Sequence, residues 1–421
     1  MTLSNYQNQF ETIFKKENIP DEMKNLKKDA FSKFLKTGFP TQKWEDWRFT
    51  NLSKLKKKTF HISKKKNIPF NDKYLSNYKL NGVDSIIFFN GHYQKEFSSK
   101  SESYEIISVN NYFNKFNIKN NSSNKSPFEF LNTAFMENSC LIKTKPNIDN
   151  PNPIRILYLL EDENNLIVSP RIHICISKNS SATFIEDYNG SYGSFFQNGL
   201  TKISLKDNSS LNHIRIQSNS ISTINVHNLY IEQNQNSQYK LTQFSEGGLL
   251  SRLNIKSNLN GPGSESLISG LSLSKHKQHI DNNIAVNHNS PNCISNQNFK
   301  YILKDNSSGV FNGKTIVTKK AQKTHSNQSN KNLLLSENAV MHSNPQLEIY
   351  ADDVKCSHGS TTGQINEDIL FYLRSRGLDI LSSKTLLLKG FASEIFQTIK
   401  NNSIQKFIDK KFDNWLTIND Y

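Results

Sequence analysis

The sequence of 421 residues lacks the marks of several large classes of protein. It holds no apolar run near the roughly 20 residues that a membrane-spanning helix needs, and its first residues include no uninterrupted apolar segment suited to a secretory signal. Its four cysteines lie far apart and form no CxxC pair, so neither a disulfide framework nor a self-contained zinc site is indicated. These absences predict a cytoplasmic protein with reduced thiols and no membrane partner.

The common nucleotide and hydrolase motifs are missing as well. No GxxxxGKS/T, no GxGxxG after a strand and no GxSxG occurs, so an NTPase, a dinucleotide enzyme and an elbow-type serine hydrolase all lack their phosphate-binding or nucleophile device. Asp352 and Asp353 are adjacent and are expected on opposite faces of a strand, which prevents them from acting as the paired carboxylates of a glycosidase. The sequence therefore predicts that the chain is not an enzyme.

Acidic side chains are few relative to basic ones, which gives a formal net charge of +15. Such a charge suits nucleic acid, an acidic membrane surface or an acidic protein. The densest lysine runs, at 54–58 and 64–66, lack the interleaved aromatic residues of a base-stacking surface. We therefore expect a solvated, lysine-rich surface and no nucleic-acid partner.

Residues 1–150 are expected to form a mainly helical region with a β-hairpin. Residues 41–52 are expected to form a short helix in which Trp44 and Trp47 share a packed face. Asn90-Gly91 stands between two apolar runs, which predicts a hairpin with a tight primed turn.

Residues 151–360 change to short strands separated by Asn, Ser, Gly and Asp, with almost no helical periodicity. In PRIHICIS, three isoleucines alternate with other residues, the pattern of a strand with one buried face. The hexapeptide LKDNSS occurs at 205–210 and again at 303–308, which is natural if similar turns recur along a solenoid. A sandwich and a barrel stay open as alternatives, and the repeat favours a β-solenoid core.

Three histidines and an aspartate gather in SKHKQHIDNNIAVNH, at His276, His279, Asp281 and His288. One interpretation is a metal-ligand set, although the HExxH spacing of a helical zinc site is absent. The alternative is that the histidines are solvated or cap successive turns of the solenoid, and it is favoured.

Residues 361–421 return to helical spacing and are expected to form a bundle of three helices. Asn366 is expected to cap the first helix, with Glu367 and Asp368 in its first turn, and Gly377 to end it. The apolar face of these helices is expected to cover the open end of the solenoid, with the binding of a partner as the alternative.

Cys356 and His358 lie two residues apart on a predicted strand, so both side chains should point the same way. A thiolate and an imidazole form a good soft-metal pair, but zinc or iron needs about two more ligands. Two interpretations stay open on these residues alone. The pair is either a partly buried thiol beside a hydrogen-bonding histidine, which is favoured for an isolated Cys-x-His, or part of a site completed by a distant residue or a second subunit.

The stretch IYADDVKCSHGSTTGQINEDILFYLRSRG resembles the C-terminal signature of the SufD family, subunits of the SUF iron-sulfur cluster assembly machinery. The resemblance extends back through FNGKTIVTKKAQKTHSNQSNKNLLLSENA and HIDNNIAVNHNSPNCISNQNFKYIL and, more loosely, to KWEDWRFTNL and FEFLNTAF, so it covers most of the chain. Ser360 stands where the family more often has Ala. The related SufB family shares the architecture, but its equivalent stretch does not read KCSHG.

The resemblance implies a mainly β fold, with a right-handed parallel β-helix core between helical N- and C-terminal regions. It implies pairing with SufB through the β-helix edge, docking of the ATPase SufC on the C-terminal helices, and no tightly bound cofactor. A homodimer is a further expectation for the isolated chain. Cys356 and His358 would then lie at the SufB interface, and His358 is the better candidate for holding a transient iron-sulfur cluster shared with SufB.

We therefore expect a non-catalytic scaffold subunit of the SUF complex. Two alternatives belong to other classes. A β-helix carbohydrate-active enzyme would need acidic or basic groups that converge in a groove, and a basic nucleic-acid-binding protein is motivated by the net charge.

Overall fold

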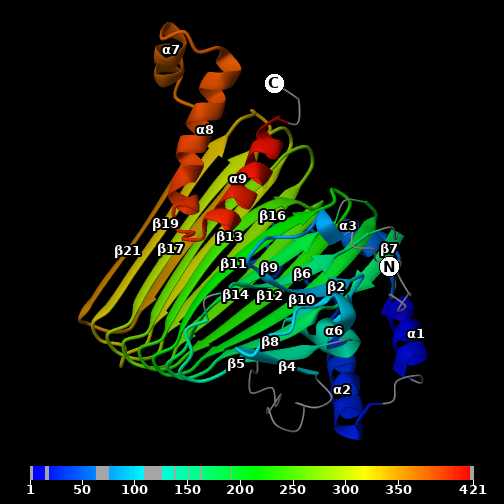
Figure 1. Cartoon of the computed structure of the whole chain (residues 1–421). Helices are drawn as coiled ribbons and strands as arrows, with labels where there is room; N and C mark the ends of the chain where they lie inside the picture. Colours follow the sequence, from blue (N-terminus) through cyan, green and yellow to red (C-terminus); the bar gives the residue numbers. More distant parts are fainter. Residues whose placement is uncertain are drawn as a thin grey trace.

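The computed structural model describes residues 3–14, 19–62, 75–108, 126–136, 139–150, 152–161, 164–190 and 192–417. In these ranges, the strands belong to two long sheets that face each other across a shared core (Figure 1). Sheet A has 11 strands: β1 (His61–Ile62), β4 (Tyr104–Ser108), β5 (Cys140–Thr144), β7 (Asn164–Val168), β8 (Arg171–Ile176), β10 (Ser194–Leu205), β12 (Ile224–Gln233), β14 (Leu250–Leu259), β16 (His279–His288), β18 (Ser308–Val317) and β20 (Val340–Ile349). Sheet B has 10 strands: β2 (Asp84–Phe89), β3 (His92–Tyr93), β6 (Ile154–Leu159), β9 (Ser181–Asn189), β11 (Ser210–Asn219), β13 (Gln238–Gly247), β15 (Glu265–Ser274), β17 (Ile294–Leu303), β19 (Thr324–Leu334) and β21 (Val354–Gly363).

The chain crosses from sheet A to sheet B and back again, and one such pair of strands is a rung. Strands that are neighbours in a sheet therefore lie one full rung apart in the sequence. Phe196 of β10 pairs in parallel with Ile224 of β12, which pairs in the same way with Leu250 of β14. The predicted mainly β fold, a parallel β-solenoid between helical ends, is confirmed.

The interior of the solenoid follows from the alternation of each strand. In β11, Leu211 faces inward, whereas Ile214 and Ile216 face outward. Because the register is parallel, inward residues of successive rungs stack into rows that fill the space between the sheets. The resulting core is one continuous cluster that runs from Ile86 in β2 to Phe311 in β18.

Asparagine recurs at the turns that lead from sheet A to sheet B. Asn179, Asn208 and Asn236 all have φ values between 52° and 56°, the left-handed region that asparagine tolerates better than most residues. Their side chains form a ladder, because the Asn208 Nδ2 donates to Asn179 Oδ1 at 3.1 Å and the Asn236 Nδ2 to Asn208 Oδ1 at 3.2 Å. These three asparagines therefore serve the tight turns of the solenoid.

The hexapeptide LKDNSS forms a turn in both copies, but the two turns differ. At 205–210 the turn leads from sheet A to sheet B, and Asn208 has a φ of 56°. At 303–308 the turn leads from sheet B back to sheet A, and Asp305 instead has a φ of 57°. Both copies of the repeat therefore mark turns of the solenoid, as predicted. The two turns do not occupy equivalent positions in their rungs.

The β2–β3 connection is a tight antiparallel hairpin. Phe88 lies opposite Tyr93, and Asn90 and Gly91 between the two strands have φ values of 44° and 88°. Positive φ at both central residues is what a type I′ turn, one of the two primed turns, requires. β2 also pairs in parallel with β6, so the hairpin is part of sheet B.

The N-terminal helices cover the outer face of sheet A. They are α1 (Leu3–Phe14), α2 (Asp21–Thr37), α3 (Ser53–Lys57) and α6 (Pro127–Phe135), together with the 3-10 turn η1 (Glu45–Trp47). Their apolar side chains pack against outward residues such as Phe196, Val226 and Leu250.

The expected helix over 41–52 is wrong, because the segment forms only η1 before α3 begins. Trp47 is buried and lies under the Arg252 guanidinium, whereas Trp44 is 40% exposed. Trp44 has extended backbone, with a ψ of 130°, so the two rings do not share one helical face.

The C-terminal helices are α7 (Glu367–Ser375), α8 (Ile380–Phe396) and α9 (Asn402–Thr417), and α7 has the predicted Asn366 cap, whose side chain accepts from the Ile369 N–H. The second half of α8 and α9 cover the outer face of sheet B (Figure 1). The expectation that these helices cover the open end of the solenoid is wrong. Sheet B carries an outward apolar row, including Ile214, Phe244 and Leu271, and α8 and α9 bury that row instead.

None of the helices in the described ranges combines the length and the apolar composition needed to cross a bilayer.

Candidate functional site

Cys356 and His358 lie on β21, the last strand of sheet B. β21 pairs on one side with β19, in a register that places Cys356 beside Ser326 and His358 beside Gln328. Ser326 and Gln328 are buried and face the interior, so the parallel register makes Cys356 and His358 face the interior side as well. The pairing of β21 with β19 therefore agrees with the prediction that the two side chains share a face of the strand.

The last rung, β20 and β21, ends both sheets, and no further rung covers it within the part of the chain that the structure describes. Residues of β21 that occupy interior positions are consequently half-buried or exposed, whereas their counterparts on β19 are buried. The two strands of this rung also meet, because Ser343 Oγ of β20 lies 2.7 Å from Ser360 Oγ of β21. The end of the solenoid thus exposes a row of side chains that the rest of the fold keeps inside.

The Cys356 thiol is half-buried against a small apolar cluster that contains Val317, Ala321 and Ala351. This burial raises the pKa of Cys356, although a hydrogen bond involving the Ser326 backbone opposes the effect. The thiol is therefore protonated at neutral pH, and a soft metal would have to displace its proton. His358 lies in an exposed position on the same side of the strand.

Apolar side chains accompany these two donors at the last rung. Val340 is 45% exposed, Ile349 40% and Tyr350 62%, and Met341 is partly buried against the solenoid core. An exposed apolar group of this kind at a sheet end is typical of a protein–protein contact.

The histidines of SKHKQHIDNNIAVNH do not come together. His276 lies in a turn beside Asp305, His279 lies on the outer face, where it contacts Thr50 and Ser308, and His288 is buried inside the solenoid, 2.8 Å from Ser295 Oγ. The described residues contain no group of three or more His, Cys, Asp or Glu side chains that could hold a metal ion. The interpretation as solvated or turn-capping histidines fits His276 and not His288.

Asp352 and Asp353 are not strand residues, which corrects the expectation. Both lie exposed in the turn between β20 and β21, where the Asp353 N–H donates to Gln322 Oε1 at 2.9 Å and its carbonyl accepts from the Lys323 N–H at 2.6 Å. Their backbone groups hold the last turn against the previous one.

The sequence indicated an apolar face on the C-terminal helices but did not locate its exposed part, which lies on α7 and the first half of α8. Figure 1 shows this part of the chain standing clear of the strands. Its exposed side chains are Ile369, Phe371, Tyr372, Leu378, Ile380, Leu381 and Leu386. The signal was the run ILFYL after the cap, which is too apolar for a helix that faces water on most sides.

Comparison with known proteins gives matches along most of the chain. The family described as "SUF system FeS cluster assembly, SufBD core domain" matches residues 158–391, and the "SufBD protein N-terminal region" matches residues 2–156. An iron-sulfur cluster assembly SufBD family protein of Synechocystis is 30% identical over 387 residues, which cover 87% of this chain and 85% of that protein. The iron-sulfur cluster assembly protein SufD of Escherichia coli is 28% identical over 379 residues, 88% of each chain. SufD of Plasmodium berghei is 29% identical over 252 residues, 59% of this chain and 19% of that protein.

Proposed function

The chain belongs to the SufBD family of SUF-system iron-sulfur cluster assembly proteins, and from this membership we propose that it is a non-catalytic scaffold subunit that pairs with SufB and docks the ATPase SufC. The observation that carries the proposal is the uncovered last rung, β20 and β21. A second solenoid of the same architecture could continue both sheets there and cover the exposed interior row.

In this arrangement Cys356 and His358 contribute to a cluster site at the SufB interface. The two residues supply a thiol and an imidazole on one side of β21, and a nascent cluster would need further ligands, which SufB would provide. His358 is the more accessible donor, because it is exposed and Cys356 is half-buried in an apolar cluster. The cluster is the cargo of the complex and no part of the resting chain.

The docking surface for SufC is proposed on α7 and the start of α8. Phe371 is 74% exposed and Tyr372 55%, and Leu381 continues the surface at 49%. α9 and the second half of α8 are buried on sheet B, so the exposed part is anchored to the solenoid. Movement of SufC during ATP hydrolysis would reach the last rung through this connection.

The test uses the full chain co-expressed with SufB and SufC from the same organism. His358→Ala should leave the three proteins together and lower cluster formation, measured by visible absorbance and by iron and sulfide per complex, by about tenfold. Cys356→Ser is expected to lower it less.

His325→Ala provides the matched control, because His325 is an exposed histidine of β19 that faces the other way. Its complex should assemble clusters like the parent. Clusters formed at the parental rate and yield by the His358→Ala complex would refute the role of His358, and failure of the three chains to co-purify would refute the scaffold itself.

A further inference from the structure

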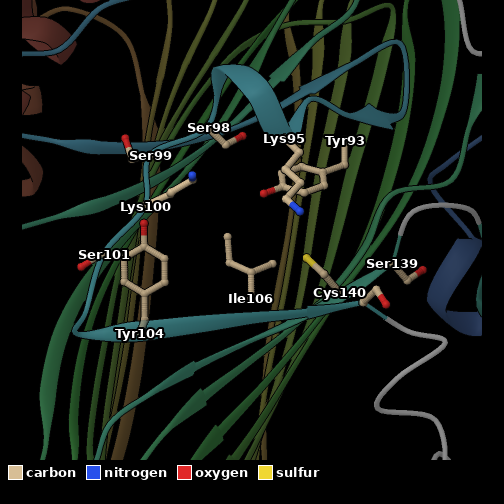
Figure 2. Close-up of a pocket in the computed structure, with 11 residues that line it drawn as sticks. Tyr93, Lys95, Ser98, Ser99, Lys100, Ser101, Tyr104, Ile106, Ser139 and Cys140 are labelled. Atoms are coloured by element: carbon tan, nitrogen blue, oxygen red, sulfur yellow. The ribbon is translucent and has the colours of Figure 1, made fainter.

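A cavity of about 530 Å³ lies at the opposite end of the solenoid from the last rung. It is formed by the β2–β3 hairpin, the 3-10 turn η2 (Lys95–Phe97), the segment that leads into β4, and the start of β5 (Figure 2). Its volume falls within the range of pockets that hold small molecules.

The floor of the cavity is apolar and belongs to the solenoid core. Tyr104 and Cys140 are buried members of the core cluster, and Tyr93 and Ile106 pack against it. Burial raises the pKa of Cys140 to about 12 and also raises the pKa of Tyr93, so both groups are neutral. A protonated thiol and neutral phenols are poor metal ligands, and they suit the apolar body of an organic molecule.

The rim of the cavity is cationic. Lys95 and Lys100 line it, and neither has an ion pair with another described residue. No carboxylate is among the described lining residues, although the charge of Asp84, next after burial, raises the pKa of Tyr104. By contrast, Lys300 and Lys314 elsewhere on the solenoid lie 2.5 Å and 2.6 Å from glutamate oxygens. Figure 2 shows the Lys100 side chain and the Tyr93 hydroxyl directed toward the same open space.

Two hydroxyls in the cavity wall have no partner. Tyr104 is 5% exposed and Ser139 2% exposed, and neither hydroxyl makes a hydrogen bond within the described chain. Other hydroxyls of the wall are used locally, since Ser98 Oγ donates to the Gln94 carbonyl at 2.7 Å. A buried hydroxyl without a partner is costly, and a bound acceptor removes that cost.

We propose that this cavity binds a small organic anion. Its phosphate or carboxylate group accepts hydrogen bonds from the Lys95 and Lys100 ammonium groups and from the Tyr104 hydroxyl. Its apolar body lies against the Tyr93 ring and Ile106. Two lysines and a phenol that have no partner among the described residues, together with an apolar floor, select for a molecule with both parts.

The proposal is tested on the isolated full chain by calorimetric titration with four probes. Phenyl phosphate and benzoate carry both parts, inorganic phosphate carries only the anion, and benzyl alcohol only the ring. We expect at least one of the first two probes to bind at least about tenfold more tightly than either of the last two. The stronger of phenyl phosphate and benzoate identifies the anionic group.

Substitution locates the binding. The double variant Lys95→Ala/Lys100→Ala should lower the affinity for the anionic probe by about tenfold or more. The isosteric Tyr104→Phe should lower this affinity several-fold. Lys319→Ala/Lys320→Ala is the control, because these two lysines are exposed in a turn near the other end of the solenoid. The proposal is overturned if neither organic anion binds at millimolar concentration, or if both cavity variants retain parental affinity.

Discussion

At the scale of single residues, the solenoid holds ionisable side chains in an interior that excludes water. Glu186 and His213 are completely buried, with Oε2 and Nε2 3.3 Å apart, and Arg215 lies over the Tyr188 ring. Burial alone would raise the pKa of Glu186, but the contact with His213 outweighs burial and the pKa is lowered to about 2. Glu186 therefore stabilises the fold at pH values above the pKa that a glutamate has in the unfolded chain. This contribution is lost as the pH falls toward the lower pKa of the folded state.

His227 belongs to the same interior group and gives a prediction about acid stability. Burial, and next the charge of Arg215, lower the pKa of His227 to about 3. Below pH 6.5, the ordinary pKa of histidine, His227 stays neutral in the folded protein but gains a proton in the unfolded chain. The unfolding free energy therefore decreases as the pH is lowered. Between about pH 7.5 and 5.5 this loss amounts to about 1.4 kcal/mol for one histidine. Urea unfolding of His227→Gln at these two pH values should show a loss of unfolding free energy that is smaller than the parent's by this amount.

The exposed His325 of β19 provides the control for this experiment. His325→Gln should show the same pH dependence as the parent. His227→Gln is also expected to lose stability at every pH, because Nε2 lies 3.1 Å from Thr201 Oγ1. The change of unfolding free energy with pH is therefore decisive, and not its value at one pH. The same change in His227→Gln as in the parent would contradict the prediction.

At the scale of elements, the turns from sheet A to sheet B depend on left-handed residues. Asn208 has a φ of 56° and lies between Asn179 and Asn236 in the asparagine ladder. Alanine at this position is strained by the left-handed backbone and also lacks the two ladder hydrogen bonds. Glycine lacks the hydrogen bonds but adopts this backbone conformation without strain. We expect Asn208→Ala to lower the unfolding free energy by about 1–2 kcal/mol more than Asn208→Gly. Urea unfolding checks this, and equal losses would show that the backbone conformation is not the cause.

The elements could be predicted from the sequence where one local rule decides them. Alternation identified strands such as β8, and the Asn366 cap placed the start of α7. The turns show the limit of such rules. The same six residues place the left-handed φ at Asn208 in one copy of LKDNSS and at Asp305 in the other, because the direction of the crossing differs. No short-range pattern contains that information.

At the scale of the whole molecule, helices pack on the outer faces of both sheets, while two apolar regions of the described chain stay exposed near its C-terminal end. N-terminal helices bury sheet A, and α8 with α9 buries sheet B. The last rung and the α7–α8 surface remain exposed. The sequence could place Cys356 and His358 on one side of a strand, but their exposure depends on whether anything covers β21. That depends on where the C-terminal helices pack, which their own periodicity does not determine.

The two open regions predict that the two partners can be lost separately. Phe371→Asp places a charge at a side chain that is 74% exposed on α7, and Tyr350→Asp does the same at a side chain 62% exposed beside the last rung. Because both side chains are largely exposed, neither change should unfold the chain. Phe371→Asp should weaken SufC binding by about 30-fold or more and leave SufB bound, and Tyr350→Asp should do the reverse. Affinity capture through a tag on this chain, followed by quantification of both partners, measures the outcome. Loss of both partners in either variant would show that the surfaces are not independent, and loss of neither would move the interfaces elsewhere.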